Sequence, residues 1–317
     1  MKGPAEMTFN PRHRFINLAQ SVLLLAGMGA IGWVALNAIV GPDLALAIVL
    51  GSLGGLLLAP GMSKQILIRA YRARRLTGRD FPEGLAILGE LARRAGLPRV
   101  PELYYIPSEL PNAFAIGKPE DSVVCISDGL LRLLDRRELA GVLAHEVAHV
   151  AHRDLWIMGL ADALSRAVSL ASWFGQVILL VNLPLILMGA AYVPWEVPLL
   201  LIFSPTIMAL LQLALSRTRE YEADLGGARL SGDPEGLASA LLKLERSAGR
   251  LWEEMFLPGR RIPVPSLLRT HPPTEERVQR LRALAGPLRP THPEAPLRLP
   301  QVGRIAPPRF GPWGVWR

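Results

Sequence analysis

Residues 143–150 read Leu143-Ala144-His145-Glu146-Val147-Ala148-His149-Val150, and the rest of the chain is organised around them. On a helix, His145 and His149 share one face and lie about 6 Å apart along the axis. At this spacing two neutral imidazoles can bind one tetrahedral Zn2+. Glu146 lies on the next ridge, beside the metal but not bound to it, where its carboxylate can accept a proton from a zinc-bound water. The stretch therefore predicts two metal ligands and one general base.

The residues around this stretch predict where its helix begins and how it is buried. Asp135 is a candidate N-cap, and Glu138 three residues later completes a capping box, so the helix is expected to start at about Arg136. Apolar residues on its inner faces are Leu139, Val142, Leu143, Val147 and Val150. The alternative is an ordinary buried helix on which two histidines and a glutamate bind no metal.

The composition points to a membrane protein. Of the 317 residues, 50% are hydrophobic and the mean hydropathy is +0.27, which is too apolar for a soluble enzyme of this size. The net charge is +8, but the aromatic residues do not alternate with the basic ones, so we expect anionic lipid and no nucleic acid as its partner. The single cysteine, Cys125, excludes an internal disulfide, suits a reducing compartment and is a candidate for the core.

Two apolar hairpins are predicted to cross the membrane. The first covers residues 15–62 with a turn at Gly41-Pro42-Asp43, and the second covers residues 155–215 with a break at residues 193–198. Neither turn carries Lys or Arg, whereas residues 64–79 carry six. By the positive-inside rule the ends of the hairpins are therefore cytoplasmic. The expected protein is a multi-pass α-helical protein of the cytoplasmic (inner) membrane with four spans.

The segments outside the hairpins are predicted to form one cytoplasmic α+β domain. Residues 63–154 contain an amphipathic helix at 82–95, three strand-like runs and the helix with the two histidines. Residues 216–286 are expected to be the second part of this domain, soluble and helical from about Asp233 to Gly286. The three strand-like runs are 102–106, 112–117 and 122–126. Residues 1–14 are read as a cytoplasmic N-terminus, and the Pro- and Arg-rich tail, residues 287–317, as extended or disordered.

A catalytic zinc site needs a third protein ligand and an open position for water. His152 lies about 10 Å beyond His145 on a continuous helix, too far to share the ion. Glu220 and Asp224 are four residues apart, so one carboxylate can bind zinc while the other orients a ligand imidazole. Glu222 would point about 160° away from Asp224, and Glu220 is the preferred ligand. The alternative is a solvated charged turn after a membrane helix.

These motifs resemble those of the HtpX-like membrane zinc metallopeptidases, relatives of the CAAX prenyl proteases. The resemblance rests on residues 145–149 and 220–224, on Asn112-Ala113-Phe114-Ala115 and on His271-Pro272-Pro273, and it covers about residues 10–285. It implies Glu220 as third ligand, Asp224 as the orienting carboxylate, one Zn2+ per chain in a gluzincin-type peptidase core, and His271 in or near the active site. From the residues alone, His271 can instead be a helix-start residue before the two prolines.

The predicted function is that of a zinc-dependent endopeptidase in protein quality control. Residues Asn112 to Ala115 are expected to form an edge strand that pairs with extended substrates, which favours misfolded or loosely structured proteins. If the last span ends near Leu215 and its helix continues, Glu220 lies about 7–8 Å further on, close to the cytoplasmic lipid surface. The expected partners are protein or peptide substrates and the lipid bilayer. A dedicated processing peptidase of the CAAX type and a non-catalytic membrane scaffold with a structural zinc remain alternatives, and the oligomeric state is open.

Overall fold

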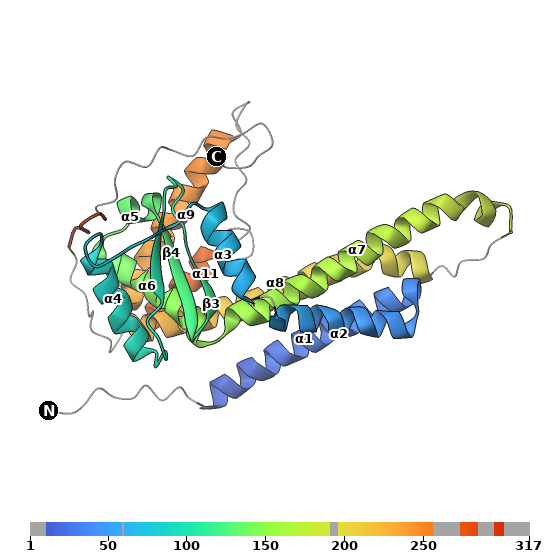
Figure 1. Cartoon of the computed structure of the whole chain (residues 1–317), viewed down its shortest axis with the longest axis horizontal. Helices are drawn as coiled ribbons and strands as arrows, with labels where there is room; N and C mark the ends of the chain where they lie inside the picture. Colours follow the sequence, from blue (N-terminus) through green and yellow to red (C-terminus); the bar gives the residue numbers. More distant parts are fainter. Residues whose placement is uncertain (1–10, 59, 191–195, 256–272, 285–294, 301–317) are drawn as a thin grey trace. The chain divides into compact units, whose positions relative to one another are not determined.

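The chain folds into two compact units, each built from two separate stretches of sequence. The structure is a computed structural model that describes residues 11–58, 60–190, 196–255, 273–284 and 295–300 (Figure 1). Unit 1 contains the residues up to 58 and residues 157–218, and unit 2 contains residues 59–156 and 219–317. Unit 1 thus takes in most of the two predicted hairpins, and unit 2 takes in most of the chain predicted to be cytoplasmic.

The first part of unit 1 is a pair of helices, α1 (Pro11–Val40) and α2 (Pro42–Leu58). Gly41 joins them with a φ of +80°, a left-handed conformation that glycine adopts without steric cost. The Gly41 carbonyl accepts a hydrogen bond from Ala45 N at 3.1 Å, which starts the second helix. The sequence prediction of a tight turn at this position is confirmed.

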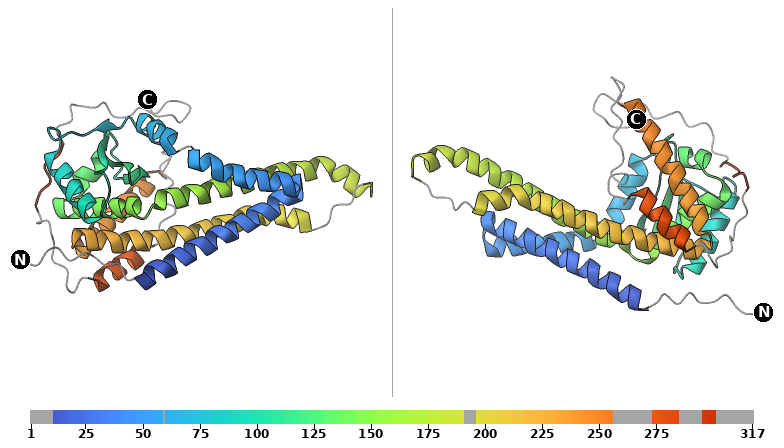
Figure 2. Two further views of the ribbon diagram at one scale, coloured as in Figure 1. Left: turned by 60° about the horizontal axis from the view of Figure 1, so that its bottom comes forward. Right: turned by 180° about the vertical axis from the view of Figure 1, so that it is seen from behind.

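The second part of unit 1 comes from α7 (Asp154–Leu187) and α8 (Glu196–Ser231), which run side by side (Figure 2). Polar side chains join these two helices along their apolar length. Ser165 Oγ donates to Gln212 Oε1 at 2.8 Å, and Ser172 Oγ donates to the Leu201 carbonyl. Hydrogen bonds of this kind between helices are a source of helix association in lipid.

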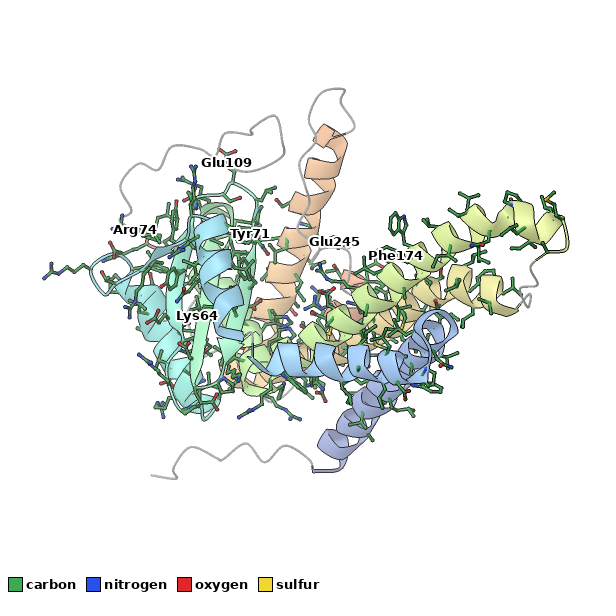
Figure 3. All side chains as sticks on the ribbon, turned by 45° about the vertical axis from the view of Figure 1, so that its right-hand side comes forward. Lys64, Tyr71, Arg74, Glu109, Phe174 and Glu245 are labelled. Carbon is green, nitrogen blue, oxygen red and sulfur yellow. The ribbon has the colours of Figure 1, made fainter. Side chains whose placement is uncertain are left out.

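By length and composition, three described helical segments can cross a membrane: Ala19–Asn37, Trp156–Leu187 and Leu199–Ser231. Most of their residues are not buried, and large apolar side chains such as Leu180 and Phe174 are exposed, the latter labelled in Figure 3. Such a surface is suited to lipid rather than to water. The fourth predicted span corresponds to α2, whose 17 residues reach about 25 Å and lie at the short end of the range for spanning helices.

Unit 2 contains a four-stranded sheet in the order β1-β2-β4-β3. β1 is Arg74–Arg75, β2 is Glu102–Ile106, β3 is Ala113–Lys118 and β4 is Asp121–Ser127. β2 and β4 are parallel, and the other two pairs are antiparallel. The three predicted strands are confirmed to within one residue at each end, and β3 lies at an edge of the sheet.

Helices cover both faces of the sheet. α3 (Pro60–Ala70) packs on one face, where Leu67 and Ile68 contact the cluster around Ile116 and Cys125. Tyr71, just after α3, contacts Phe114 of β3 with ring centroids 5.3 Å apart. Figure 3 shows α3 in front of the strands, with Lys64 on the helix and Tyr71 just after its end. The opposite face carries the main core.

That main core is built from helices that bury their apolar stripes on the sheet and on one another. α6 (Arg136–Ala151) packs against β3 and β4, and both α4 (Pro82–Arg94) and α9 (Pro234–Met255) pack on α6. α11 (Thr274–Ala283) packs on α9, and the short α5 (Asp128–Leu133) follows β4. The predicted helix at 82–95 is confirmed to within one residue, the predicted helix start at about Arg136 is confirmed, and the two histidines lie on α6.

The described part of the C-terminal tail, residues 295–300, is extended and lies against unit 2. The Ala295 carbonyl accepts a 3.2 Å hydrogen bond from the backbone N–H of Arg136, in the first turn of α6. Leu297 packs against the main core, and Pro300 is buried. This short segment therefore satisfies one of the free amides that every helix leaves at its start.

Candidate metal centre

The position of α6 is fixed at its start and by close packing along its length. Asp135 Oδ1 accepts from Glu138 N at 2.8 Å, and Glu138 Oε2 accepts from Asp135 N at 2.9 Å, so the predicted capping box is present. Further along, the helix is approached by α8 at a glycine. A Cβ on Gly227 would lie 3.0 Å from the Cα of His145. The absence of a side chain at Gly227 therefore lets α8 lie directly against the backbone of the first histidine.

Three buried or half-buried side chains from α6 and α8 form a group that can hold a metal ion: His145, His149 and Glu220. The two Nε2 atoms are 3.1 Å apart. Glu220 Oε2 is 3.6 Å from His145 Nε2, and Glu220 Oε1 is 3.7 Å from His149 Nε2. Ligands at tetrahedral corners about 2.1 Å from one Zn2+ would be roughly 3.4 Å apart. The donor set and its separations fit zinc.

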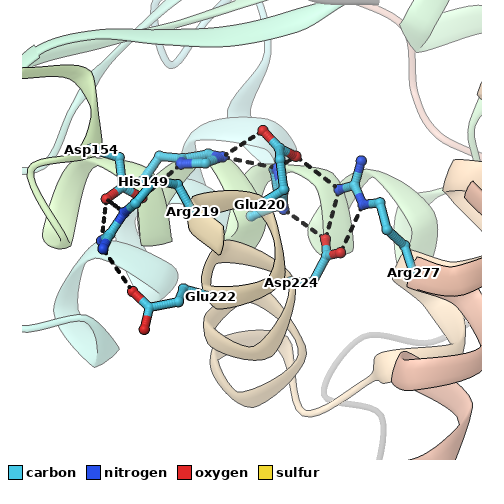
Figure 4. A network of polar contacts seen from close by, with 8 residues as sticks. His149, Asp154, Arg219, Glu220, Glu222, Asp224 and Arg277 are labelled. Atoms are coloured by element: carbon cyan, nitrogen blue, oxygen red, sulfur yellow. Dashed lines mark hydrogen bonds and ion pairs between the residues drawn. The ribbon is translucent and has the colours of Figure 1, made fainter. Parts of the chain in front are cut away.

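Each histidine has a carboxylate beside its other ring nitrogen, and Figure 4 shows Asp154 beside His149. His145 Nδ1 is 3.0 Å from Asp224 Oδ1, and His149 Nδ1 is 2.9 Å from Asp154 Oδ2. With Nδ1 facing a carboxylate, each Nε2 is left as the metal-binding atom. Asp224 was predicted for this role, whereas Asp154 was not.

Each of these carboxylates is in turn held by a buried arginine. Arg277 of α11 donates from Nε and Nη2 to the two oxygens of Asp224, both at 2.7 Å, and its Nη2 lies 3.3 Å from Glu220 Oε2. Burial opposes the charged form, but hydrogen bonds to Asp224 outweigh it and raise the pKa of Arg277. Arg219 of α8 donates from Nε to Asp154 Oδ1 at 2.6 Å. The two arginines are held in place as permanent positive charges behind the site.

The pKa of His149 reflects this concentration of carboxylates. Burial by itself favours the neutral ring, but the hydrogen bond to Asp154 and the charges of Glu220, Asp154 and Glu146 raise the pKa to about 9. In the absence of a metal the ring is therefore protonated at neutral pH. A metal ion that binds through Nε2 takes the place of that proton.

Glu146 is half-buried, on α6 directly after His145. Its charge contributes to raising the pKa values of His149 and Arg277, which indicates that the carboxylate lies within electrostatic reach of the group. It also contributes, after burial, to raising the pKa of Cys125 to about 12. Cys125 is thus a neutral, buried thiol, and its predicted assignment to the core is confirmed.

The structure brings some predicted site residues together and leaves others apart. Glu222 points to Arg219, 3.0 Å from its Nη1, and not to the metal ligands. His152 is the C-cap of α6, beyond the end of the helix at Ala151. Ala113, Phe114 and Ala115 lie on the edge strand β3, directly after Asn112. His271 lies outside the described residues.

Three residues that complete the polar network were not predicted: Asp154, Arg219 and Arg277. Asp154 and Arg219 are 65 positions apart in the sequence, and Arg277 and Asp224 are 53 apart. A local signal existed for Asp154, because it is an acidic residue five positions after a metal-ligand histidine. No spacing rule connects the two arginines to their partners.

The comparisons with known proteins concern most of the chain. Residues 81–285 match the model of peptidase family M48. The chain is 39% identical over 257 residues to a protease HtpX homolog of Thermococcus kodakarensis, covering 77% of this chain and 88% of that protein. It is also 39% identical over 274 residues to a protease HtpX homolog of Pelotomaculum thermopropionicum, covering 83% and 97%. The crystal structure of S. mikatae Ste24p matches with a TM-score of 0.49 and 20% identity over 84% of this chain and 65% of that chain, a likeness too distant to bear on function.

Proposed function

The chain belongs to peptidase family M48, and from this premise we propose that it is a membrane-bound, zinc-dependent endopeptidase that hydrolyses misfolded or loosely structured proteins. The observation that carries the proposal is the group formed by His145, His149 and Glu220, whose donor atoms lie 3.1, 3.6 and 3.7 Å apart. Within the described residues the group has three members. Catalytic zinc sites use three protein ligands, whereas structural sites use four, so this count supports an enzyme rather than a scaffold.

The zinc would be held by Nε2 of His145, by Nε2 of His149 and by the Glu220 carboxylate. A bound zinc ion would supply Lewis acidity, lowering the pKa of a coordinated water to about 7 and polarising the peptide carbonyl. Asp224 and Asp154 keep the two imidazoles in the tautomer that binds metal. Arg277 holds Glu220 and Asp224 in place.

Glu146 is proposed as the general base and acid. Among the described residues its carboxylate makes no hydrogen bond or ion pair, and it is half-buried, so its oxygens remain available to water and substrate. The carboxylate would accept the proton of the attacking water and pass it to the nitrogen of the leaving amine. This shuttle explains why a carboxylate is needed beside the ligands although it is not one of them.

The edge strand β3 is proposed to bind the substrate backbone. Asn112 exchanges hydrogen bonds with Ser127, since its carbonyl accepts from Ser127 N at 2.9 Å and its N–H donates to Ser127 Oγ at 2.8 Å. In an antiparallel pair the direction alternates, so the N–H and C=O of Ala113 and Ala115 point away from β4. An extended chain can pair with these groups, whereas a folded one has its backbone already paired.

The location and biological role are likewise proposals. We propose a multi-pass protein of the inner membrane with four spans and a gluzincin-type domain in the cytoplasm. The basic segment from Lys64 to Arg79 supports this orientation by the positive-inside rule. A preference for unfolded segments of membrane proteins near this surface would make the enzyme a component of protein quality control.

The test is cleavage of an unfolded protein by the purified chain and by a Glu146→Gln variant. Gln has the same size but cannot accept the proton, so the variant should keep its fold and its zinc and lose nearly all activity. Bound zinc is measured by metal analysis of both proteins, with Glu220→Ala as the variant that should lose metal. Cleavage retained by Glu146→Gln would refute the assigned base.

A further inference from the structure

A chain of buried charges extends from His149 away from the metal ligands. Asp154 Oδ2 is 2.9 Å from His149 Nδ1, and Asp154 Oδ1 accepts the 2.6 Å hydrogen bond from Arg219 Nε. Arg219 Nη1 reaches Glu222 at 3.0 Å. Figure 4 shows Arg219 lying between Asp154 and Glu222. The order of contacts is therefore His149, Asp154, Arg219 and Glu222.

The two middle members of this chain, Asp154 and Arg219, have little access to water. Asp154 is 1% exposed and Arg219 is 5% exposed. A buried charge is costly unless it is paired, so neither side chain can turn away without leaving the other uncompensated. The Asp154–Arg219 pair is accordingly expected to be rigid. Because Asp154 lies 2.9 Å from His149 Nδ1, a rigid Asp154 restricts the orientation of the His149 ring.

The pair also joins separate elements of the fold. Asp154 is the first residue of α7, reached from α6 through the turn at His152 and Arg153. Arg219 lies on α8, directly before the ligand Glu220. The salt bridge thus connects the carboxylate behind one metal ligand to the helix that carries another.

His145 does not need such a connection. Its orienting carboxylate, Asp224, is on α8 itself, one helical turn after Glu220. The carboxylate for His149 comes from a different helix, and Arg219 is the residue of α8 that holds it. The two histidines are therefore tied to Glu220 by different means.

We propose that Arg219 is a positioning residue that acts through Asp154, fixing the ring of His149 relative to Glu220 and thereby setting the zinc affinity. In this role the guanidinium of Arg219 acts through its 2.6 Å hydrogen bond to Asp154. The inference rests on the proposed function, because it takes the three-residue group to be a zinc site.

The experiment measures the zinc affinity of the full-length protein in detergent by competition with a chelator. The variants are Arg219→Met, Asp154→Asn and the double variant. Arg217→Met is the matched control, because Arg217 is an exposed arginine two positions away on the same helix with no ion pair to another described residue. Arg219→Lys tests rescue, since lysine keeps the charge but not the forked donors.

Loss of an orienting partner behind a metal ligand typically costs 10–100-fold in metal affinity, and we expect about this loss for Arg219→Met and for Asp154→Asn. The double variant should bind zinc no more weakly than Asp154→Asn, because both changes remove the same interaction, the Asp154–Arg219 pair behind His149. Arg219→Lys should be intermediate, and Arg217→Met should match the wild type.

Two results would overturn the inference. One is unchanged zinc affinity in Arg219→Met. The other is a further loss when Arg219→Met is added to Asp154→Asn, a comparison that stands even if the single arginine variant does not fold. A wild-type protein that binds no zinc would refute the proposed function instead, so the two failures are distinguishable.

Discussion

A methyl group added at Gly227 should test how closely the two ligand-bearing helices must approach. In Gly227→Ala the new Cβ would lie 3.0 Å from both Cα and N of His145, which are backbone atoms and cannot rotate away. Carbon atoms in contact prefer about 3.5–4.0 Å, so α8 and α6 would have to separate by about 0.5 Å or more. That displacement is as large as the tolerance of a preorganised metal site, roughly 0.5 Å.

The expected change in the free energy of unfolding of Gly227→Ala is the sum of two opposing contributions. Replacing glycine by alanine inside a helix gains up to about 1 kcal/mol of stability, whereas overpacking a tight contact costs about 1–3 kcal/mol. Gly89→Ala provides the first term alone, because Gly89 is inside α4 and its Cβ would meet nothing within 4 Å. We therefore expect Gly227→Ala to be less stable than Gly89→Ala by about 1–3 kcal/mol.

The assay is heat unfolding of both metal-free variants followed by circular dichroism, together with zinc affinity. Gly227→Ala should unfold at a lower temperature than Gly89→Ala and should bind zinc more weakly than the wild type. If Gly227→Ala instead unfolds together with Gly89→Ala and binds zinc normally, the close contact of α8 with His145 is not what assembles the site.

Three further predictions concern proton competition, a turn and the edge strand. The pKa of His149 is raised from 6.5 to about 9, so zinc must displace a proton below about pH 9, and the apparent zinc affinity should fall by up to about tenfold for each pH unit below that value. Without metal, the protonated ring stabilises the fold fully below about pH 6.5, and this contribution is lost as the pH rises through about 9. Unfolding midpoints that change with pH in parallel with and without zinc would contradict the assignment. Arg153 has a φ of +59°, so Arg153→Gly should raise the unfolding midpoint by the equivalent of about 1 kcal/mol and Arg153→Val should lower it, whereas equal midpoints would show that the turn is relaxed. Ala113→Pro removes an outward N–H at the start of β3 and should raise KM for an unfolded substrate several-fold with zinc affinity unchanged. Phe114→Pro instead removes a hydrogen bond to β4 and should unfold the domain. An unchanged KM in Ala113→Pro would argue against pairing of β3 with the substrate.

The parts of the fold that follow from local pattern were predictable from the sequence. The capping box of Asp135 and Glu138, the spacing of His145 and His149, and the strand-like runs depend on residues within one element, and the structure confirms them. The group of His145, His149 and Glu220 required joining two segments 71–75 residues apart, and there the resemblance to a known family supplied what spacing alone left open.

The parts that were missed depend on contacts between distant elements. Arg219 and Arg277 read in the sequence as ordinary basic residues on helical segments, and only the packing of α7, α8 and α11 shows that both are buried against carboxylates. The sharp turn that returns Asp154 to His149 depends on Arg153 in a left-handed conformation, which arginine seldom adopts. The prediction placed the end of the last span near Leu215 and considered that its helix continues to Glu220, and α8 is indeed helical to Ser231.

The short stretch from Ala295 to Pro300 has a practical consequence for anyone who shortens this protein for crystallisation or expression. Its Ala295 carbonyl accepts a hydrogen bond from the first turn of α6, Leu297 packs against the main core of unit 2, and Pro300 is buried. A recombinant version that stops before Ala295 would leave the Arg136 amide without this acceptor and would expose apolar side chains of the core near the N-terminus of α6, the helix that carries both histidines. Boundaries for such versions are therefore best drawn after Pro300, with any affinity tag attached beyond it.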